Sequence, residues 1–396
     1  MDPVRNPFAP GAGSPPPELA GRTAVLNDAS VALQRLAAGR AAQSVILVGL
    51  RGVGKTVLLN AIEAAAEKAG HSALMMEAHE GKRLAALLVP RLRELLMRLS
   101  RIERAREQAN RGLRVLKSFV GAVKKLKVGD IELELGIEAE QGTADSGDLE
   151  ADLPSLLLSV AEAARAAGTA ATLLIDEMQY LEEKEFSALI MSVHRINQKG
   201  LPLVLMGAGL PQILALAGDS KSYAERLFSF PAIGALDTED ARSAIRAPVE
   251  QSAARIEEAA LHEILEQSRC YPYFLQQWGY ESWNMASGAT ITRQDVERAT
   301  LKTLGSLDQS FFRVRVDRCK PSEKRYMRAL AELGPGEHRS GAIAELLGLK
   351  VTSVGPTRAS LIRKGMLYSP AHGDNTFTVP MFDEFMRREM PQMPER

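Results

Sequence analysis

A glycine-rich loop that ends in a lysine and a threonine has the residue types needed to bind a nucleoside triphosphate. Residues 49–56 read Gly-Leu-Arg-Gly-Val-Gly-Lys-Thr and match the phosphate-loop pattern G-x-x-x-x-G-K-[ST] in full. The glycines let backbone N–H groups approach the phosphates, and the N-terminus of the following helix adds roughly half a positive charge. Lys55 is expected to reach the β- and γ-phosphates, and the Thr56 hydroxyl to hold Mg²⁺. The nucleotide contacts expected in this loop are Gly49, Leu50, Arg51, Gly52, Val53, Gly54, Lys55, Thr56 and Val57.

Two adjacent carboxylates follow another apolar run later in the chain. Residues 172–175 read as a buried parallel strand, and Asp176 and Glu177 follow at its C-terminal end, where ligands of such sheets bind. Asp176 is expected to hold Mg²⁺, directly or through water, and Glu177 to polarise the attacking water as general base. The alternative is that the two acids only form the first turn of a helix.

The apolar runs around these residues indicate the elements that position them. Residues 44–48 read as a buried strand before the loop, and 201–206 as a third strand that ends in Gly-Ala-Gly at 207–209. Helices are expected between the strands, at 57–69, 83–107, 153–167 and 184–198. Strands that alternate with helices predict an α/β fold with a doubly wound parallel sheet, and the phosphate loop makes it a P-loop domain.

Length and composition set the class of protein. A chain of 396 residues, 45% hydrophobic and 25% charged, is expected to form two or three soluble globular domains. Two cysteines make no disulfide framework, and no secretory or membrane-spanning run is present, so a cytoplasmic protein without membrane contact is expected. The net charge is zero, so any nucleic-acid surface must be local. Six scattered histidines lack ligand spacing, so no metal beyond Mg²⁺ is expected.

The two nucleotide motifs and their flanks resemble those of AAA+ ATPases of the replication-initiator-like, archaeal-ATPase type. The resemblance rests on residues 49–56 and on Asp176 and Glu177, covers about residues 18–310, and extends through a C-terminal winged helix to nearly the whole chain. It implies ATP and Mg²⁺ as cofactors, hydrolysis of ATP, and a small helical lid after the sheet. Arg22, which follows Gly21 before an apolar helix, resembles the segment that packs against adenine in that family.

The resemblance also implies an arginine finger. Arg226, in the stretch 222–228, is expected to reach a γ-phosphate bound by a neighbouring subunit or domain. Such a finger in trans would require a homo-oligomer. The alternative, held at equal weight, is an arginine on a solvated helix face or one paired with Glu225.

The expected lid departs from the resembled family in two places. It begins near residue 236, with Asp237 or Thr238 as N-cap. Its segment 271–279 lacks the arginine that replication initiators often place there, and residues 207–209 lack the polar residue often found at that strand end. Slow turnover, or a switch that mostly binds ATP, would fit both departures. The aromatic residues of the segment are expected in the lid core rather than on a stacking platform: Tyr271, Tyr273, Phe274 and Trp278.

The segment between the two nucleotide motifs is unusually basic. Residues 101–127 hold nine basic residues against two acidic ones. Apolar residues at helical spacing predict an amphipathic helix there: Leu113, Leu116, Val120 and Val123. Residues 128–135 predict a turn and a half-buried strand, and 136–152 an acidic loop. In the resembled initiators an insert helps contact DNA. The favoured alternative is a solvated basic face that balances the acidic loop.

The C-terminal region predicts a winged helix-turn-helix, with helices at 321–333, 340–347 and 353–364 and strands at 366–368 and 377–379. Pro356 suits only the first turn of a helix, so the third helix is expected to begin near Gly355. Residues 320–370 hold nine basic residues against four acidic ones, a local excess that favours DNA over the alternative of a protein contact. The residues expected on DNA are Ser353, Thr357 and Arg358 in the major groove, and Arg363, Lys364 and His372 on the backbone or minor groove.

The expected organisation therefore has four parts. They are an irregular, Pro- and Gly-rich arm at 1–20, a P-loop AAA+ domain at 21–235 with an insert at about 101–152, a helical lid at 236–310 and a winged-helix domain at 311–396. The favoured function is an ATP-binding and hydrolysing switch that couples nucleotide state to duplex DNA binding. The alternatives are a regulatory or signalling NTPase whose winged helix binds protein, and a transposition-helper ATPase.

Overall fold

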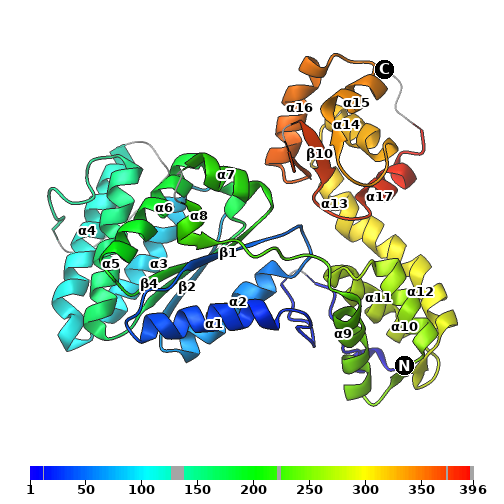
Figure 1. The fold of residues 1–396 in the computed structure, drawn as a ribbon, viewed down its shortest axis with the longest axis horizontal. Coiled ribbons are helices and arrows are strands. Elements are labelled where there is room, and N and C mark those ends of the chain that lie inside the picture. The colour runs from blue at the N-terminus through cyan, green and yellow to red at the C-terminus, as the bar shows by residue number, and fades with distance from the viewer. Residues whose placement is uncertain (12, 126–137, 221–223, 372, 393–396) are drawn as a thin grey trace.

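The computed structural model describes residues 1–396 except for 12, 126–137, 221–223, 372 and 393–396. Three groups of elements are visible in Figure 1: a sheet covered by helices at the left, a group of helices at the lower right, and a C-terminal unit at the upper right. A single helical segment, drawn in yellow, connects the last two groups.

The sheet has five parallel strands in the order β2-β3-β4-β1-β5. Their bounds are β1 Ser44–Val48, β2 Ser72–Glu77, β3 Ala171–Asp176, β4 Leu203–Gly209 and β5 Phe228–Ser229. Side chains of β1 alternate between two cores, with Val45 and Leu47 on one face and Ile46 and Val48 on the other. The doubly wound α/β sheet expected from the sequence is therefore confirmed.

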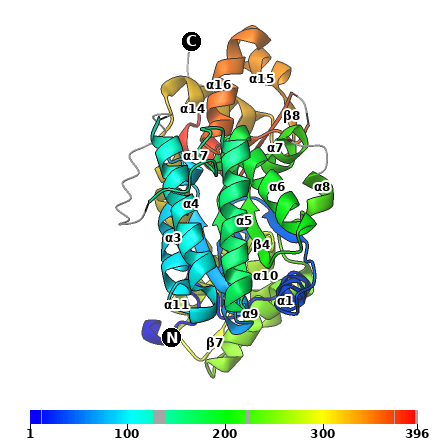
Figure 2. The ribbon, with the colours of Figure 1, turned by 90° about the vertical axis from the view of Figure 1, so that its left-hand side faces the viewer.

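Two layers of helices bury the two faces of this sheet. On one face lie α1 (Thr23–Ala37) and α2 (Lys55–Lys68). On the other lie α3 (Leu84–Leu99), α4 (Arg106–Lys125), α5 (Leu149–Ala167) and α6 (Glu183–Gln198), and α7 (Gln212–Ser220) and α8 (Ala224–Leu227) pack on α6. Figure 2 shows α3, α4 and α5 running alongside one another, with α4 packed on both α3 and α5. The apolar face predicted for α4 is buried in this layer, at Leu113, Leu116, Val120 and Val123.

One helix boundary and one additional strand in this domain differ from the expectation, and one expected element lies outside the described residues. The helix expected at 83–107 ends at Leu99, and the short 3-10 helix η2 (Glu103–Ala105) separates it from α4. β2 was not foreseen, because Ala, Leu and Met dominate its sequence and favour a helix; pairing with β3 imposes the strand. The turn and strand expected at 128–135 lie outside the described residues.

The lid consists of α9 (Thr238–Gln251), α10 (Glu258–Ser268), α11 (Pro272–Met285) and α12 (Arg293–Ser306), with short strands β6 (Arg255–Ile256) and β7 (Thr290–Ile291). The expected N-cap is present, since the Asp237 side chain accepts a hydrogen bond from the Asp240 amide. α12 continues through a π-helical segment, η4 (Leu307–Phe312), into α13 (Arg313–Val316). This stretch, residues 307–316, is the connecting helix. The boundary expected between 310 and 311 therefore falls inside one continuous helix, which no Gly or Pro interrupts after Ser306.

The C-terminal unit has three helices and a small antiparallel sheet. The bounds are α14 Pro321–Glu332, β8 His338–Arg339, α15 Ser340–Leu346, α16 Val351–Arg363, β9 Leu367–Tyr368, β10 Asp374–Phe377 and α17 Phe382–Glu389, and the strand order is β8-β10-β9. Three helices followed by a hairpin is the element order of a winged helix-turn-helix. The second hairpin strand lies at 374–377, not at the expected 377–379, because Thr378 and Val379 turn into the interior.

The expectation for Pro356 was wrong. α16 begins at Val351 and contains Pro356 beyond its first turn. A proline there removes the hydrogen bond that would reach the Thr352 carbonyl. Thr352 and Pro356 are both exposed, so water can solvate this carbonyl, and burial of Val354 and Leu361 holds the helix in place.

The N-terminal arm, which contains only the short 3-10 helix η1 (Pro3–Arg5), is anchored on the lid. Phe8 is buried against Gly279, where a Cβ atom would lie 2.8 Å from the Phe8 ring. The Asn6 side chain donates to the Tyr280 carbonyl at 3.0 Å. The described arm residues between Phe8 and α1 then lie beside the phosphate loop.

Candidate functional site

The phosphate loop lies between β1 and α2 in a conformation that requires glycine. Gly52 and Gly54 have φ of 85° and 92°, in the left-handed region. A Cβ atom on Gly49 would lie 2.1 Å from the Ile233 carbonyl oxygen. Gly54 is the N-cap of α2, so the first amides of this helix face the loop and can bind an anion.

Lys55 is buried and is held above the loop. Its ammonium group donates to the carbonyl oxygens of Gly49 at 3.0 Å and Leu50 at 2.9 Å. Burial lowers the pKa of Lys55 to about 8, and the nearby carboxylates of Glu177 and Asp176 oppose that shift. The site thus holds a desolvated cation whose charge a phosphate would stabilise.

The structure brings Thr56 and Asp176 together. β1 and β3 both pair with β4, so their C-terminal ends meet at one edge of the sheet. The Thr56 hydroxyl donates to the Asp176 carboxylate at 2.6 Å. Burial raises the pKa of Asp176, against the hydrogen bond from Thr56. A hydroxyl and a buried carboxylate are the oxygen ligands that Mg²⁺ takes beside a nucleotide, so the donor set fits this ion.

Glu177 lies next to Asp176 in a left-handed conformation, with φ of 53°. Its carboxylate forms an ion pair with the Arg51 guanidinium at 3.6 Å and accepts a hydrogen bond from the Gln179 amide. Both side chains of the ion pair are four-fifths buried. The expected general base is therefore held by a residue of the phosphate loop itself.

Arg51 also joins the phosphate loop to the C-terminal unit. Its backbone N–H donates to the Thr378 carbonyl at 3.1 Å, and its guanidinium donates to the Gly365 carbonyl at 3.4 Å. The same guanidinium donates to the Tyr180 hydroxyl at 2.9 Å, and the Tyr271 hydroxyl donates to the Arg51 carbonyl. One arginine thus contacts the sheet domain, the lid and the C-terminal unit.

A cavity of about 750 Å³ surrounds these residues, within the size range of small-molecule sites. Most of its wall comes from the arm (residues 9–11 and 13–22), the phosphate loop, the start of α11, residues 310–319 and residues 364–366. The wall also includes Glu80, Glu177, Tyr180, Leu236 and Ala244. Arg22 lines it and donates to the Gly234 carbonyl at 2.6 Å. Burial lowers the pKa of Arg22.

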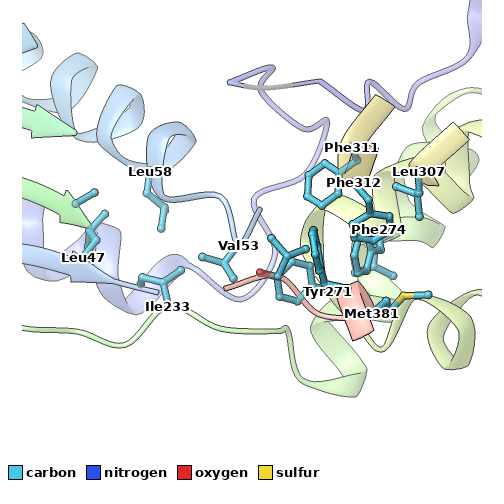
Figure 3. Close-up of a cluster of buried hydrophobic side chains, with 14 of the residues drawn as sticks. Leu47, Val53, Leu58, Ile233, Tyr271, Phe274, Leu307, Phe311, Phe312 and Met381 are labelled. Atoms are coloured by element: carbon cyan, nitrogen blue, oxygen red, sulfur yellow. The ribbon is translucent and has the colours of Figure 1, made fainter. Parts of the chain in front are cut away.

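The lid aromatics divide between core and cavity. Phe274 and Trp278 are fully buried, as expected, and Tyr271 is nearly so. Tyr273 is half-buried, lines the cavity, and stacks on Phe311 with ring centroids 4.4 Å apart. Figure 3 shows Phe311, Phe312 and Phe274 gathered where the lid meets the connecting helix, with Tyr271 beside them.

Arg226 lies on α8, is exposed, and does not line the cavity. Residues 222–223 of the stretch 222–228 lie outside the described residues. The structure thus places Arg226 away from the nucleotide site of its own chain.

The residues expected on DNA separate into two sets. Ser353 and Arg363 are exposed on α16, and Thr357 is half-buried. Arg358 points inward, where it donates to the Asn375 side chain at 2.8 Å, the Ser369 hydroxyl at 2.6 Å and the Asp374 carbonyl at 3.1 Å. His372 lies outside the described residues.

Lys364, also expected on DNA, faces the nucleotide cavity instead. Its ammonium group pairs with the Glu323 carboxylate at 2.7 Å and donates to the Arg318 carbonyl at 2.9 Å. In the insert, Arg111 pairs with Glu140 at 3.0 Å and with Glu162 at 3.5 Å, so part of the basic excess is neutralised locally.

Sequence reasoning missed the cavity residues that come from beyond the lid. Arg315, Arg318, Gly365 and Met366 all line the cavity. No local pattern marks them, because they belong to the connecting helix, to the turn after it and to a turn that follows α16. The adjacent phenylalanines Phe311 and Phe312, which pack the connecting helix on the lid, are the one sequence feature that marks this segment.

Comparison with known proteins gives two family matches and one curated relative. Residues 18–206 match the AAA ATPase domain family, and residues 309–386 match a domain of unknown function (DUF8462). An uncharacterized HTH-type transcriptional regulator of Methanocaldococcus jannaschii is 24% identical over 368 residues, which cover 90% of this chain and 85% of the regulator.

Comparison with solved structures gives matches with TM-scores above and below 0.5. The Walker-type ATPase of Pyrococcus abyssi is 15% identical, with a TM-score of 0.57 over 93% of this chain and 96% of that one. Cdc6p of Pyrobaculum aerophilum is 12% identical, with a TM-score of 0.48 over 98% and 99%.

The fold and the phosphate loop are those of an α/β P-loop protein. The chain carries an AAA ATPase domain at residues 18–206, and its fold resembles that of an archaeal Walker-type ATPase, as the sequence motifs indicate. In the described part of the chain, no helix has the length and apolar character needed to span a lipid bilayer.

Proposed function

We propose that this protein is an ATP-binding and ATP-hydrolysing switch whose nucleotide state controls what its C-terminal unit binds. The observation that carries the proposal is that Lys55, Thr56 and Glu177 line one cavity, which the lid and the C-terminal unit also line, while Asp176 is hydrogen-bonded to Thr56. In this proposal the loop amides and Lys55 bind the phosphates, and Arg22 with the arm and lid encloses the base.

Catalysis would use the residues at the end of β3. Mg²⁺, held by Thr56 and Asp176, would neutralise phosphate charge. Glu177 would take a proton from the attacking water, which requires that its carboxylate leave Arg51. This ion pair and the absence of an arginine in residues 271–279 support slow turnover.

The contacts of Arg51 would transmit the nucleotide state from the phosphate loop to the C-terminal unit. A phosphate bound in the loop would compete with Glu177 for the Arg51 guanidinium, and that guanidinium also binds the Gly365 carbonyl. A ligand shifts a conformational equilibrium only by its differential affinity for the two states. Arg51 would supply such a difference in ATP affinity, because it would bind a phosphate only when it releases Glu177 or Gly365, which lie in separate parts of the chain.

Duplex DNA is the proposed partner of the C-terminal unit. The unit has the element order of a winged helix, and the 24% identical relative is described as an HTH-type transcriptional regulator. The exposed Ser353 and Arg363 on α16, with Lys350 at its N-cap, are available for DNA, whereas Arg358 and Lys364 are held by internal partners. Arg226 would complete the site of a neighbouring subunit in a homo-oligomer.

A protein partner is the second candidate, because of an exposed apolar group at the turn between α15 and α16. Leu346, Leu349 and Val351 are 42%, 51% and 53% exposed. Such residues are typical of protein contacts and carry no attraction for phosphate. A transposition-helper ATPase would share the ATP chemistry and differ only in its partner.

Fluorescence anisotropy with a labelled duplex, with and without ATP and across a salt series, tests the proposal. We expect ATP-dependent affinity whose logarithm falls with the logarithm of salt by roughly 0.9 per phosphate contact. Absence of duplex binding at any salt would leave the protein-binding switch. Absence of ATP binding would refute both.

A further inference from the structure

Arg315 lies on α13, in the helix that connects the lid to the C-terminal unit, and lines the same cavity as Lys55, Thr56 and Glu177. Its guanidinium lies over the Phe311 ring, 4.1 Å from the ring centroid, and donates to the Phe311 carbonyl. In the part of the chain that the structure describes, no carboxylate forms an ion pair with it.

The electrostatic surroundings of Arg315 call for an anion. Burial lowers the pKa of Arg315 to about 10, and the positive charge of Arg51 acts in the same direction. Glu177 lies near enough to oppose this shift, but it is paired with Arg51. Arg315 and Arg318 line the cavity with Arg51, and the nearby Glu177 carboxylate is already paired with Arg51. The desolvated wall thus carries an excess positive charge, which is costly unless an anion binds there.

The residues around Arg315 indicate that this anion is a phosphate. Residues 271–279 of the lid carry no Lys or Arg, so the start of α11 supplies no cation to the phosphates. Guanidinium groups suit phosphate oxygens, which they can bind through two parallel hydrogen bonds. The general base of a P-loop site stands beside the outermost phosphate, and Arg315 lines the same cavity as Glu177, the proposed base.

We propose that Arg315 is a binding residue for the outermost phosphate of ATP, supplied to the cavity by the helix that carries the C-terminal unit. This inference rests on the proposed ATP function. It adds the residue by which the protein would distinguish ATP from ADP, since only ATP carries the outermost phosphate. The γ-phosphate would bridge Lys55 of the sheet domain and Arg315, so the triphosphate holds the connecting helix against the loop. ADP leaves Arg315 without this anion, and the helix loses that contact.

The test compares ATP and ADP affinities of the full chain by titration with fluorescent nucleotides. Arg315→Ala should weaken ATP binding by roughly ten- to a hundredfold, the range for loss of a charge-assisted hydrogen bond, and change ADP affinity by less than about threefold. Arg315→Lys keeps the charge and should retain part of the preference for ATP.

Arg313→Ala is the matched control, because Arg313 lies on the same turn but pairs with Glu389 at 2.5 Å and does not line the cavity. It should leave both affinities unchanged. Equal losses for ATP and ADP in Arg315→Ala, or no loss, would overturn the inference while wild-type ATP binding leaves the proposed function intact. Wild-type protein that binds no ATP would instead refute the proposed function and this inference together.

Discussion

The backbone amide of Arg51 donates a hydrogen bond of 3.1 Å to the carbonyl oxygen of Thr378, so the phosphate loop is bonded directly to the C-terminal unit. The Arg51 guanidinium reaches the Gly365 carbonyl of the same unit, and it also pairs with Glu177. Any ligand that reorganises the loop must therefore act on Glu177, the proposed general base, and on the C-terminal unit together.

Removal of the Lys55 charge should remove tight ATP binding. Lys55→Ala is expected to cost at least about 2 kcal/mol of ATP binding free energy, because each hydrogen bond to a charged group contributes roughly 1.5–3 kcal/mol. Isothermal titration calorimetry with ATP measures this binding free energy. Lys68→Ala, at the exposed C-terminal end of the same helix, is the control and should bind ATP normally. Unchanged affinity in Lys55→Ala would remove the phosphate-loop assignment.

The lowered pKa of Lys55 predicts opposite pH dependences for binding and stability. Above pH 8 the free protein loses the Lys55 charge, so ATP affinity should fall by about tenfold per pH unit. Between pH 8 and 10.5 the unfolded chain holds more protons at this residue than the folded chain, so its contribution to the unfolding free energy rises with pH. Titrations and urea unfolding from pH 7 to 10 measure both. Lys55→Ala should lack both contributions; identical profiles would contradict the assignment.

Glu177→Gln should separate ATP binding from turnover. The amide cannot act as a base, so phosphate release is expected to slow by roughly 10²- to 10⁴-fold while ATP stays bound. Glu183→Gln, on the exposed first turn of α6, is the matched control. Equal turnover in wild type and Glu177→Gln would place the general base elsewhere.

Gly365→Ala tests the link between Arg51 and the C-terminal unit. Gly365 has φ of 63°, and a Cβ atom there would lie 2.6 Å from the Arg51 guanidinium. We expect a loss of about 1–2 kcal/mol in stability, from the left-handed backbone, together with altered nucleotide affinity as Arg51 is displaced. Gly355→Ala, in the open middle of α16, should instead be neutral or stabilising. Thermal unfolding and ATP titration of both variants measure these effects. Wild-type ATP affinity in Gly365→Ala would show that the contact between Arg51 and Gly365 does not affect nucleotide binding.

Two arginines of α16 should respond differently to alanine. Arg363 is exposed, so Arg363→Ala is expected to weaken duplex binding and to reduce its salt slope by roughly 0.9, without loss of stability. Arg358 holds Asn375 and Ser369, so Arg358→Ala should lower the melting temperature. Anisotropy and thermal melts measure these effects. A duplex affinity that depends on neither residue would assign α16 to a protein contact.

The sequence alone determined the chemistry at the centre of the site. The phosphate loop is one contiguous segment, and Asp176 and Glu177 end a strand whose apolar run is plain, so local pattern was sufficient. The doubly wound sheet and the lid were predictable for the same reason. Their apolar residues recur with the periods of strand and helix.

Tertiary structure alone decided what surrounds that centre. Arg315 reaches the cavity because an uninterrupted helix carries it there, and Arg51 meets Gly365 and Thr378 only after the C-terminal unit packs on the loop. Arg358 has the residue type of a DNA contact, yet its partners turn it inward. Residues far apart in the chain make these contacts, and no spacing within a segment encodes them, because each depends on how separately folded elements pack together.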